Sequence, residues 1–266
     1  MKDFTLTTYK IFLQELIASG YSFETLQDFI QEPKNKTVIL RHDVDRKPEN
    51  ALVIAKIEKK AGIKASYYFR IVKQSYDENI IRQIAEMGHE IGYHYENLSL
   101  YRGNYELSIT HFELDLKKLR RFYPVKTICM HGSPLSEWDN RDLWKKYDYR
   151  DFGIIAEPYF DVDFREVFYL TDTGRRWDGD SVSVRDKVKK TGVRGQGSGV
   201  RNLRLRKTWD IIDAAEKGLL PDRIMLNTHP QRWDDRLGPW MKELVWQNVK
   251  NVVKRVVVRR GKPISE

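Results

Sequence analysis

Cysteine is almost absent from this sequence, since Cys129 is the single one in 266 residues. One cysteine excludes an internal disulfide framework and any zinc site built from several thiolates. Long hydrophobic runs are absent too, because every apolar stretch falls far short of the roughly 18 residues that a transmembrane helix needs. Residues 1–20 interrupt their apolar positions with Lys10, Gln14 and Glu15, which is not the pattern of a signal peptide. These absences predict a soluble cytoplasmic protein without an integral membrane segment.

The composition allows a sizeable core. Hydrophobic residues make up 41% of the chain and charged residues 32%, so disorder is not expected. The sequence contains no internal repeat and no linker rich in proline and serine, and α/β barrels of this length are common. We therefore expect one domain over residues 1–266, with a helical N-terminal extension at about 1–35 and a basic loop at about 175–207.

Positive charge is concentrated in one segment. The chain carries +9, and residues 175–207 contain eleven Lys/Arg and three Asp, an excess of +8, so the remainder carries +9 − 8 = +1. A nucleic-acid surface would spread its basic residues more widely, and we expect no nucleic-acid partner. Two interpretations stay open: a solvated loop without a partner, or a loop that binds an acidic or carrier-linked glycan.

Apolar periodicity predicts short strands that alternate with helices. The expected strands are 37–43, 65–71, 90–93, 125–130, 153–156, 166–170 and 223–226. The expected helices are 9–17, 22–30, 48–61, 77–87, 104–122, 208–216 and a valine-rich stripe at 249–257. This alternation predicts an α/β fold with parallel strands and right-handed crossovers. We expect the C-terminal stripe to dock on this fold, with a partner or an anionic membrane face as alternatives.

Histidines and carboxylates lie where these strands end. Four histidines share this position: His42, His94, His131 and His229. The carboxyl ends of strands in parallel α/β barrels meet on one face, which builds the active site. We therefore expect the four imidazoles to meet in one pocket with Asp43 and Asp45, although a lone histidine at a strand end is more often structural.

Asp43 and Asp45 form the most informative pair. Strand alternation points both to the same side, about two rises of roughly 3.3 Å apart. Two carboxylates at this distance do not both stay ionised without a cation or a donor between them. A divalent metal would solve this, with one carboxylate as ligand and the other as base. The alternative role is a helix cap before Pro48, which requires only one of the two.

Four motifs, in this order, resemble those of the polysaccharide deacetylases, the NodB-homology or family 4 carbohydrate esterases. They are ILRHDVD at 39–45, GHEIGYHYENLS at 88–99, HGSPLS at 131–136 and LNTHP at 226–230. The first is similar to the divergent His-Asp-Val-Asp branch. The resemblance covers about residues 37–230 and implies a distorted (β/α) barrel with seven or eight mostly parallel strands. It also implies a metal-dependent deacetylase acting on a sugar of a surface polysaccharide or its precursor.

The resemblance also implies a role for each matching residue. Asp43 matches the general base, Asp45 a metal-binding carboxylate and His94 a metal-binding histidine. His229 matches the histidine that acts as general acid. The implied cofactor is a divalent metal, for which zinc is our hypothesis. We expect Tyr95 and Trp177 to stack on sugar rings and the backbone near Ser133 to bind the oxyanion, with packing as the alternative role of the aromatic residues.

The sequence departs from the family pattern at the third ligand and at the base-orienting arginine. Position 98, where the family has its second histidine ligand, is Leu98, and His131 is the first choice as a replacement. The alternatives for the third ligand are Glu96, Asn97 and His89. Arg41 or Arg46 would replace the arginine that orients the base. The segment from Asp172 to Trp177 loosely resembles the motif that supports the catalytic histidine.

These departures leave alternative functions open. One is a catalytically degenerate protein of the same fold that binds glycan without turnover. Another is a metal-dependent hydrolase of a different ester, amide or phosphoester, which the basic segment favours.

Overall fold

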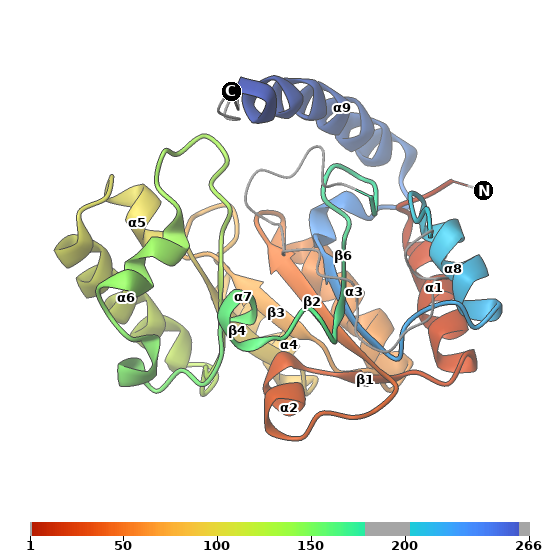
Figure 1. The fold of residues 1–266 in the computed structure, drawn as a ribbon, viewed down its shortest axis with the longest axis horizontal. Coiled ribbons are helices and arrows are strands. Elements are labelled where there is room, and N and C mark those ends of the chain that lie inside the picture. Colours follow the sequence, from red (N-terminus) through yellow and green to blue (C-terminus); the bar gives the residue numbers. More distant parts are fainter. Residues whose placement is uncertain (1, 179–202, 261–266) are drawn as a thin grey trace.

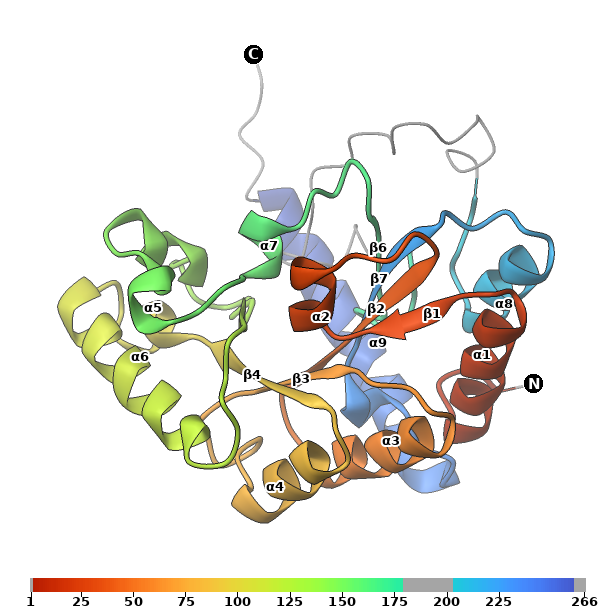
Figure 2. The same cartoon turned by 90° about the horizontal axis from the view of Figure 1, so that it is seen from below.

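The computed structural model describes residues 2–178 and 203–260, so the central part of the basic segment, 179–202, lies outside the described residues (Figure 1). A curled parallel sheet of seven strands forms the centre of the described part (Figure 2). The strands are β1 (Ser22–Glu24), β2 (Thr37–Val44), β3 (Ser66–Phe69), β4 (Glu90–Tyr95), β5 (Ile128–Met130), β6 (Phe168–Thr171) and β7 (Arg223–Thr228). Among the described helices, none has the length and apolar character to cross a membrane.

The strand order is β5-β4-β3-β2-β7-β6, with β1 paired to β2, and every strand pair is parallel. The sheet is a half-barrel that stays open between β5 and β6, as a distorted (β/α) barrel does. This confirms the predicted fold class. The strand predicted at 153–156 is present only as an isolated bridge between Thr127 and Ala156.

Helices surround the sheet. They are α1 (Leu6–Ala18), α2 (Leu26–Gln31), α3 (Pro48–Lys60), α4 (Glu78–Glu86), α5 (Asn97–Leu100), α6 (Tyr105–Arg120), α7 (Pro158–Asp161), α8 (Thr208–Glu216) and α9 (Leu237–Arg260). The helix predicted from Ser22 is wrong at its start, because Ser22 pairs with Thr37 in the sheet. Thr25 is the N-cap instead, and its side chain accepts a hydrogen bond from the Asp28 backbone N–H.

Alternation along β2 divides the core into two layers. Val38 and Leu40 pack against the outer helices, whereas Ile39 faces the interior of the half-barrel with Met225 of β7. Leu26 and Phe29 of α2 belong to this interior cluster, which fills the barrel. Arg41 and Asp43 follow Ile39 on the same face of β2, because side chains two positions apart share a face of a strand. They therefore lie directly above this apolar cluster.

The same alternation corrects the prediction for His42, which faces the outer helices and not the site. Its Nε2 lies 2.7 Å from Glu58 of α3, and its Nδ1 lies 2.6 Å from Thr228 Oγ1. Glu58 is fully buried and also accepts hydrogen bonds of 2.5 Å from the hydroxyls of Tyr9 and Tyr67. Burial raises the pKa of Glu58, but His42 and these hydrogen bonds outweigh it and lower the pKa below 4.5. The cluster fastens α1 and α3 to the sheet.

We predict that Glu58→Gln lowers the free energy of unfolding by about 1–3 kcal/mol at pH 7, because it weakens hydrogen bonds to a buried charge. The folded pKa of Glu58 lies below its unfolded value, so the stabilisation is fully present above about 4.5 and is lost as the pH falls through the folded value. Denaturant unfolding at pH 7 and below pH 4.5 measures both effects. Glu49→Gln, at an exposed position of the same helix, is the control. A difference between Glu58→Gln and the parent chain that does not shrink in acid would contradict this account.

Candidate active site

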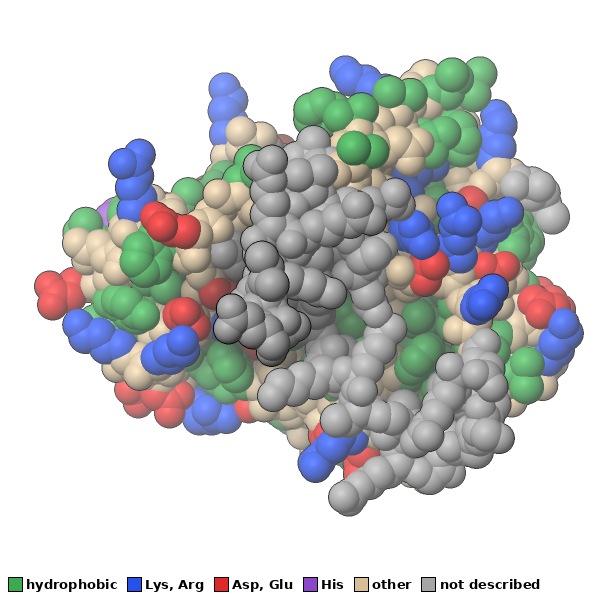
Figure 3. Space-filling model, turned by 45° about the horizontal axis from the view of Figure 1, so that its top comes forward, with side chains coloured by type: hydrophobic (Ala, Val, Ile, Leu, Met, Phe, Trp, Pro, Cys, Tyr) green, Lys and Arg blue, Asp and Glu red, His purple; other side chains and the backbone are tan. Residues whose placement is uncertain are grey.

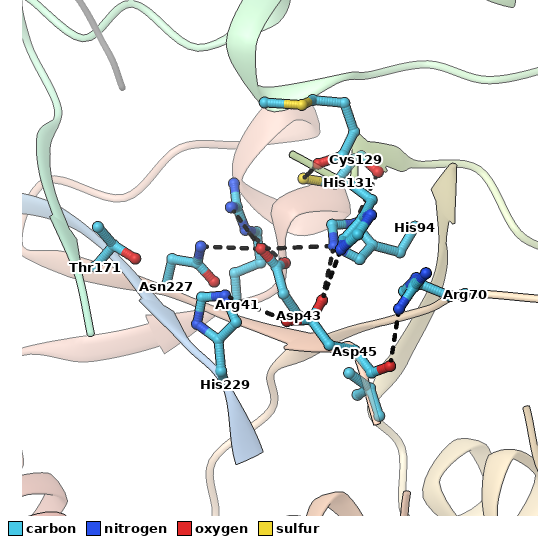
Figure 4. A network of polar contacts seen from close by, with 12 residues as sticks. Arg41, Asp43, Asp45, Arg70, His94, Cys129, His131, Thr171, Asn227 and His229 are labelled. Carbon is cyan, nitrogen blue, oxygen red and sulfur yellow. Dashed lines mark hydrogen bonds and ion pairs between the residues drawn. The ribbon is translucent and has the colours of Figure 1, made fainter. Parts of the chain in front are cut away.

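The candidate site lies at the carboxyl edge of the sheet, where the ends of the parallel strands meet (Figure 4). Its polar residues follow these ends: Asp43 and Asp45 at β2, His94 at β4, His131 after β5, Asp172 after β6 and His229 after β7. The structure thus brings together the five residues predicted to be catalytic or to bind metal. They come from four strands far apart in the sequence.

The Asp45 carboxylate faces three imidazoles. Its Oδ1 lies 3.5 Å from Nε2 of His94 and 3.6 Å from Nε2 of His131, and its Oδ2 lies 3.9 Å from Nε2 of His229. Burial opposes ionisation, but the imidazoles, His94 first, hold the pKa of the Asp45 carboxyl well below its usual range. The site therefore presents an ionised carboxylate.

Hydrogen bonds orient the two imidazoles nearest Asp45 Oδ1. His94 Nδ1 lies 2.9 Å from the Cys129 carbonyl oxygen, to which it donates. His131 Nδ1 lies 2.9 Å from Glu96 Oε2. When a neutral imidazole donates through Nδ1, its lone pair is on Nε2. Protonated imidazoles therefore donate from Nε2 toward the same carboxylate oxygen, and neutral imidazoles turn their Nε2 lone pairs toward it.

Asp45, His94 and His131 fit a divalent metal ion. Their ligand atoms all lie within 4.8 Å of one another. Asp45 Oδ1 is buried and has no hydrogen-bond partner among the described residues, which a cation at this point would explain. Two imidazoles and a carboxylate are a ligand set of catalytic zinc sites. A second candidate set, Asp43, His94 and Cys129, fits less well because Asp43 is already paired with an arginine.

Glu96 and Arg70 hold His131 in place, a role that the sequence did not reveal. Arg70 holds Glu96 through two hydrogen bonds, Nε to Oε1 at 2.7 Å and Nη2 to Oε2 at 2.8 Å, and its Nη1 donates to the Asp45 carbonyl oxygen at 3.2 Å. Burial raises the pKa of Glu96, but His131 and Arg70 outweigh it and lower the pKa. Glu96, one of the predicted alternatives for the third ligand, instead binds His131 through Nδ1.

Asp43 is held separately from this cluster. Arg41 is fully buried and donates to both carboxylate oxygens, from Nε at 3.1 Å and from Nη2 at 3.0 Å. Asn227 of β7 donates to Oδ2 at 3.0 Å. Arg46 binds Glu243 instead, so Arg41 is the arginine that orients Asp43. The role of Asn227 was missed, although it lies two residues before His229 and therefore on the same face of its strand.

His229 is oriented by Asp172. The Asp172 Oδ1 lies 2.7 Å from His229 Nδ1, and its Oδ2 accepts hydrogen bonds of 3.0 Å from the His229 backbone N–H and from the Trp233 indole. Burial raises the pKa of Asp172, but Arg232 and His229 outweigh it and lower the pKa. An ionised Asp172 directs His229 Nε2 toward Asp45. The tryptophan of this arrangement is Trp233, not the predicted Trp177.

Two of the predicted substrate contacts are wrong. Tyr95 is fully buried and packs edge-on against Trp144, and Trp177 is 3% exposed and donates its indole hydrogen bond to Thr208. Neither ring has an open face for a sugar. Ser133 is half-buried next to the site, with its Oγ 3.1 Å from His131 Nδ1, and its part in substrate binding stays a prediction.

We predict a graded loss of metal affinity when these residues are changed, measured by isothermal titration calorimetry with zinc and cobalt. Asp45→Asn and His131→Ala remove ligand atoms and weaken binding by more than about 100-fold, whereas Glu96→Gln only releases the orientation of His131 and weakens it about 10- to 100-fold. His229→Ala is the control, because His229 is held by Asp172 outside the ligand set. Unchanged affinity in His131→Ala would show that another residue is the third ligand.

The fold and the site define an α/β half-barrel protein with a cluster that could hold a metal ion at the carboxyl edge of its sheet. No protein-family model and no curated protein matches the chain. Among solved structures, the Xyl-CE4 domain of a multidomain xylanase from the hindgut metagenome of Trinervitermes trinervoides is similar to it. The similarity covers 85% of this chain and 84% of that chain, with 13% identity and a TM-score of 0.39. The function is therefore inferred from the site itself.

Proposed function

We propose that the protein is a metal-dependent deacetylase that removes an acetyl group from a sugar of a surface polysaccharide or its precursor. The observation that carries this proposal is the division of the site into three parts. Asp45, His94 and His131 face one another, while Asp43 and His229 lie beside them, each held by its own partners. The sequence motifs that resemble those of polysaccharide deacetylases support the same function.

The cation, zinc in this proposal, would be held by Asp45, His94 and His131. When bound, it supplies a Lewis acid that acidifies water and polarises a carbonyl group. Burial lowers the pKa of His94, but Asp43 and Asp45 outweigh it and raise the pKa, so protons compete with the cation for Nε2. Metal binding is therefore expected to weaken as the pH falls.

Asp43 and His229 are suited to opposite proton transfers. Asp43, fixed by Arg41 and Asn227, accepts a proton from the attacking water at its carboxylate. His229, protonated at Nε2, donates to the leaving amine or hydroxyl of the sugar. Asp172 stabilises the charged imidazole through Nδ1, as a buried carboxylate does in other histidine-dependent hydrolases.

We predict that the zinc-loaded protein releases acetate from acetylated oligosaccharides and that Asp43→Asn and His229→Ala each lower kcat by about 10²- to 10⁴-fold. Both variants should keep their bound metal, because neither residue belongs to the ligand set. His111→Ala on α6 is the control for a histidine outside the site. Acetate is measured with an enzyme-coupled assay on N-acetylated and O-acetylated substrates.

Two results would contradict the proposal. Glycan binding without acetate release by the metal-loaded protein would show a binding protein. Release of phosphate from phosphoesters, with no release of acetate, would show a different hydrolase.

A further inference from the structure

The C-terminal helix α9 has its polar and apolar faces reversed relative to an ordinary surface helix. It lies across the carboxyl side of the sheet (Figure 1). The described residues that it buries most deeply against the rest of the protein are polar and one turn apart, Glu243, Gln247 and Asn251, with Trp240 and Leu244 half-buried beside them. A surface helix normally packs an apolar face inward and presents a polar face to water.

Polar contacts hold the inner face of α9 in place. Glu243 accepts a hydrogen bond of 2.6 Å from Arg46, and Asn251 donates to the Gly174 carbonyl oxygen at 3.0 Å. Arg175 donates to the Trp240 carbonyl oxygen at 3.2 Å. These contacts fix which side of the helix faces outward. Val249 and Val252, two members of the valine stripe that was predicted to dock on the barrel, are instead 51% and 61% exposed, and the other valines of that stripe lie outside the described side chains.

The outer face of α9 is apolar over more than four turns. We call it the outer stripe, and its described members are Leu237, Met241, Val245, Trp246, Val249 and Val252. Each of them is about half exposed or more. Figure 3 shows hydrophobic side chains grouped at the upper right of the face that carries α9. A continuous exposed apolar stripe marks an interaction surface, whereas scattered exposed side chains do not.

The charge of α9 indicates what kind of surface it meets. Residues 237–260 contain six Lys/Arg and one acidic residue, Glu243, which gives 6 − 1 = +5. Glu243 is buried against Arg46, so its carboxylate is not on the outer face. A second copy of this chain would bring an equal positive charge onto this helix, and such a pairing is opposed by repulsion. An anionic partner is favoured instead.

We propose that the outer stripe of α9 binds an anionic lipid surface, with the helix lying in the plane of the interface. Apolar side chains, a tryptophan and basic residues on one helix are the features that interfacial helices use. The proposal goes beyond the deacetylase function and does not depend on it. Because α9 contacts Arg46, the residue after Asp45, it would hold the candidate site on the side of the protein that faces the membrane.

Vesicle co-sedimentation tests this proposal. We expect the full chain to bind vesicles of phosphatidylcholine mixed with phosphatidylglycerol, and to bind pure phosphatidylcholine much more weakly. The double variant Val245→Glu/Val249→Glu should lower the partition coefficient on the mixed vesicles on the order of tenfold or more, because it removes two apolar side chains and adds two negative charges. High salt should weaken binding of the parent chain.

The control is Leu107→Glu/Leu114→Glu on α6. These two leucines are 48% and 47% exposed, and the variant changes the net charge by the same amount. If both double variants lose binding equally, net charge and not the outer stripe causes it, and the proposal is wrong. It is also wrong if the parent chain does not bind the mixed vesicles, or if sedimentation velocity shows a dimer that Val245→Glu/Val249→Glu separates. Circular dichroism confirms that both variants are folded.

Discussion

The candidate site depends on one electrostatic constraint, a buried carboxylate oxygen that faces two imidazole nitrogens. Asp45 Oδ1 has no hydrogen-bond partner among the described residues, while His94 and His131 turn their Nε2 atoms toward it. Backbone and carboxylate acceptors already bind the Nδ1 atom of each imidazole, so the tautomers are determined from outside the site. A cation between Asp45 Oδ1 and the two Nε2 atoms would give all three atoms a binding partner. The surrounding hydrogen bonds hold the three side chains in the position that such a cation requires.

The parallel sheet explains why so much of the site was visible in the sequence. Strand ends meet at one edge, so Asp43, Asp45, His94 and His229 could be placed together from their positions alone. His42 was placed wrongly because it lies one residue out of step with Asp43 and points to the other side of β2. Glu96 and Arg70 directly follow the neighbouring strands β4 and β3, but their pairing was not predicted, because the sequence does not show which polar side chains beyond the strand ends meet.

Position 98 shows where the proposed metal site differs from the motif that the sequence resembles. Leu98 stands where the polysaccharide deacetylase motif that this segment resembles has a histidine, and it is fully buried in the core. His131, which follows the neighbouring strand β5, faces the Asp45 carboxylate instead, and Glu96 orients its imidazole. Aromatic residues were harder to interpret. Tyr95 and Trp177 belong to the residue types that stack on sugar rings, but both are buried in the core. The sequence patterns therefore predicted which polar residues lie together at the strand ends better than they predicted which aromatic side chains are exposed.

The most direct test of the proposed metal site is X-ray absorption spectroscopy of the zinc-loaded protein at stoichiometric metal. The account predicts first-shell scattering from nitrogen and oxygen only, with the multiple-scattering pattern of two imidazoles. In His131→Ala that pattern should fall to one imidazole. A spectrum with sulfur in the first shell, or one that His131→Ala leaves unchanged, would contradict it.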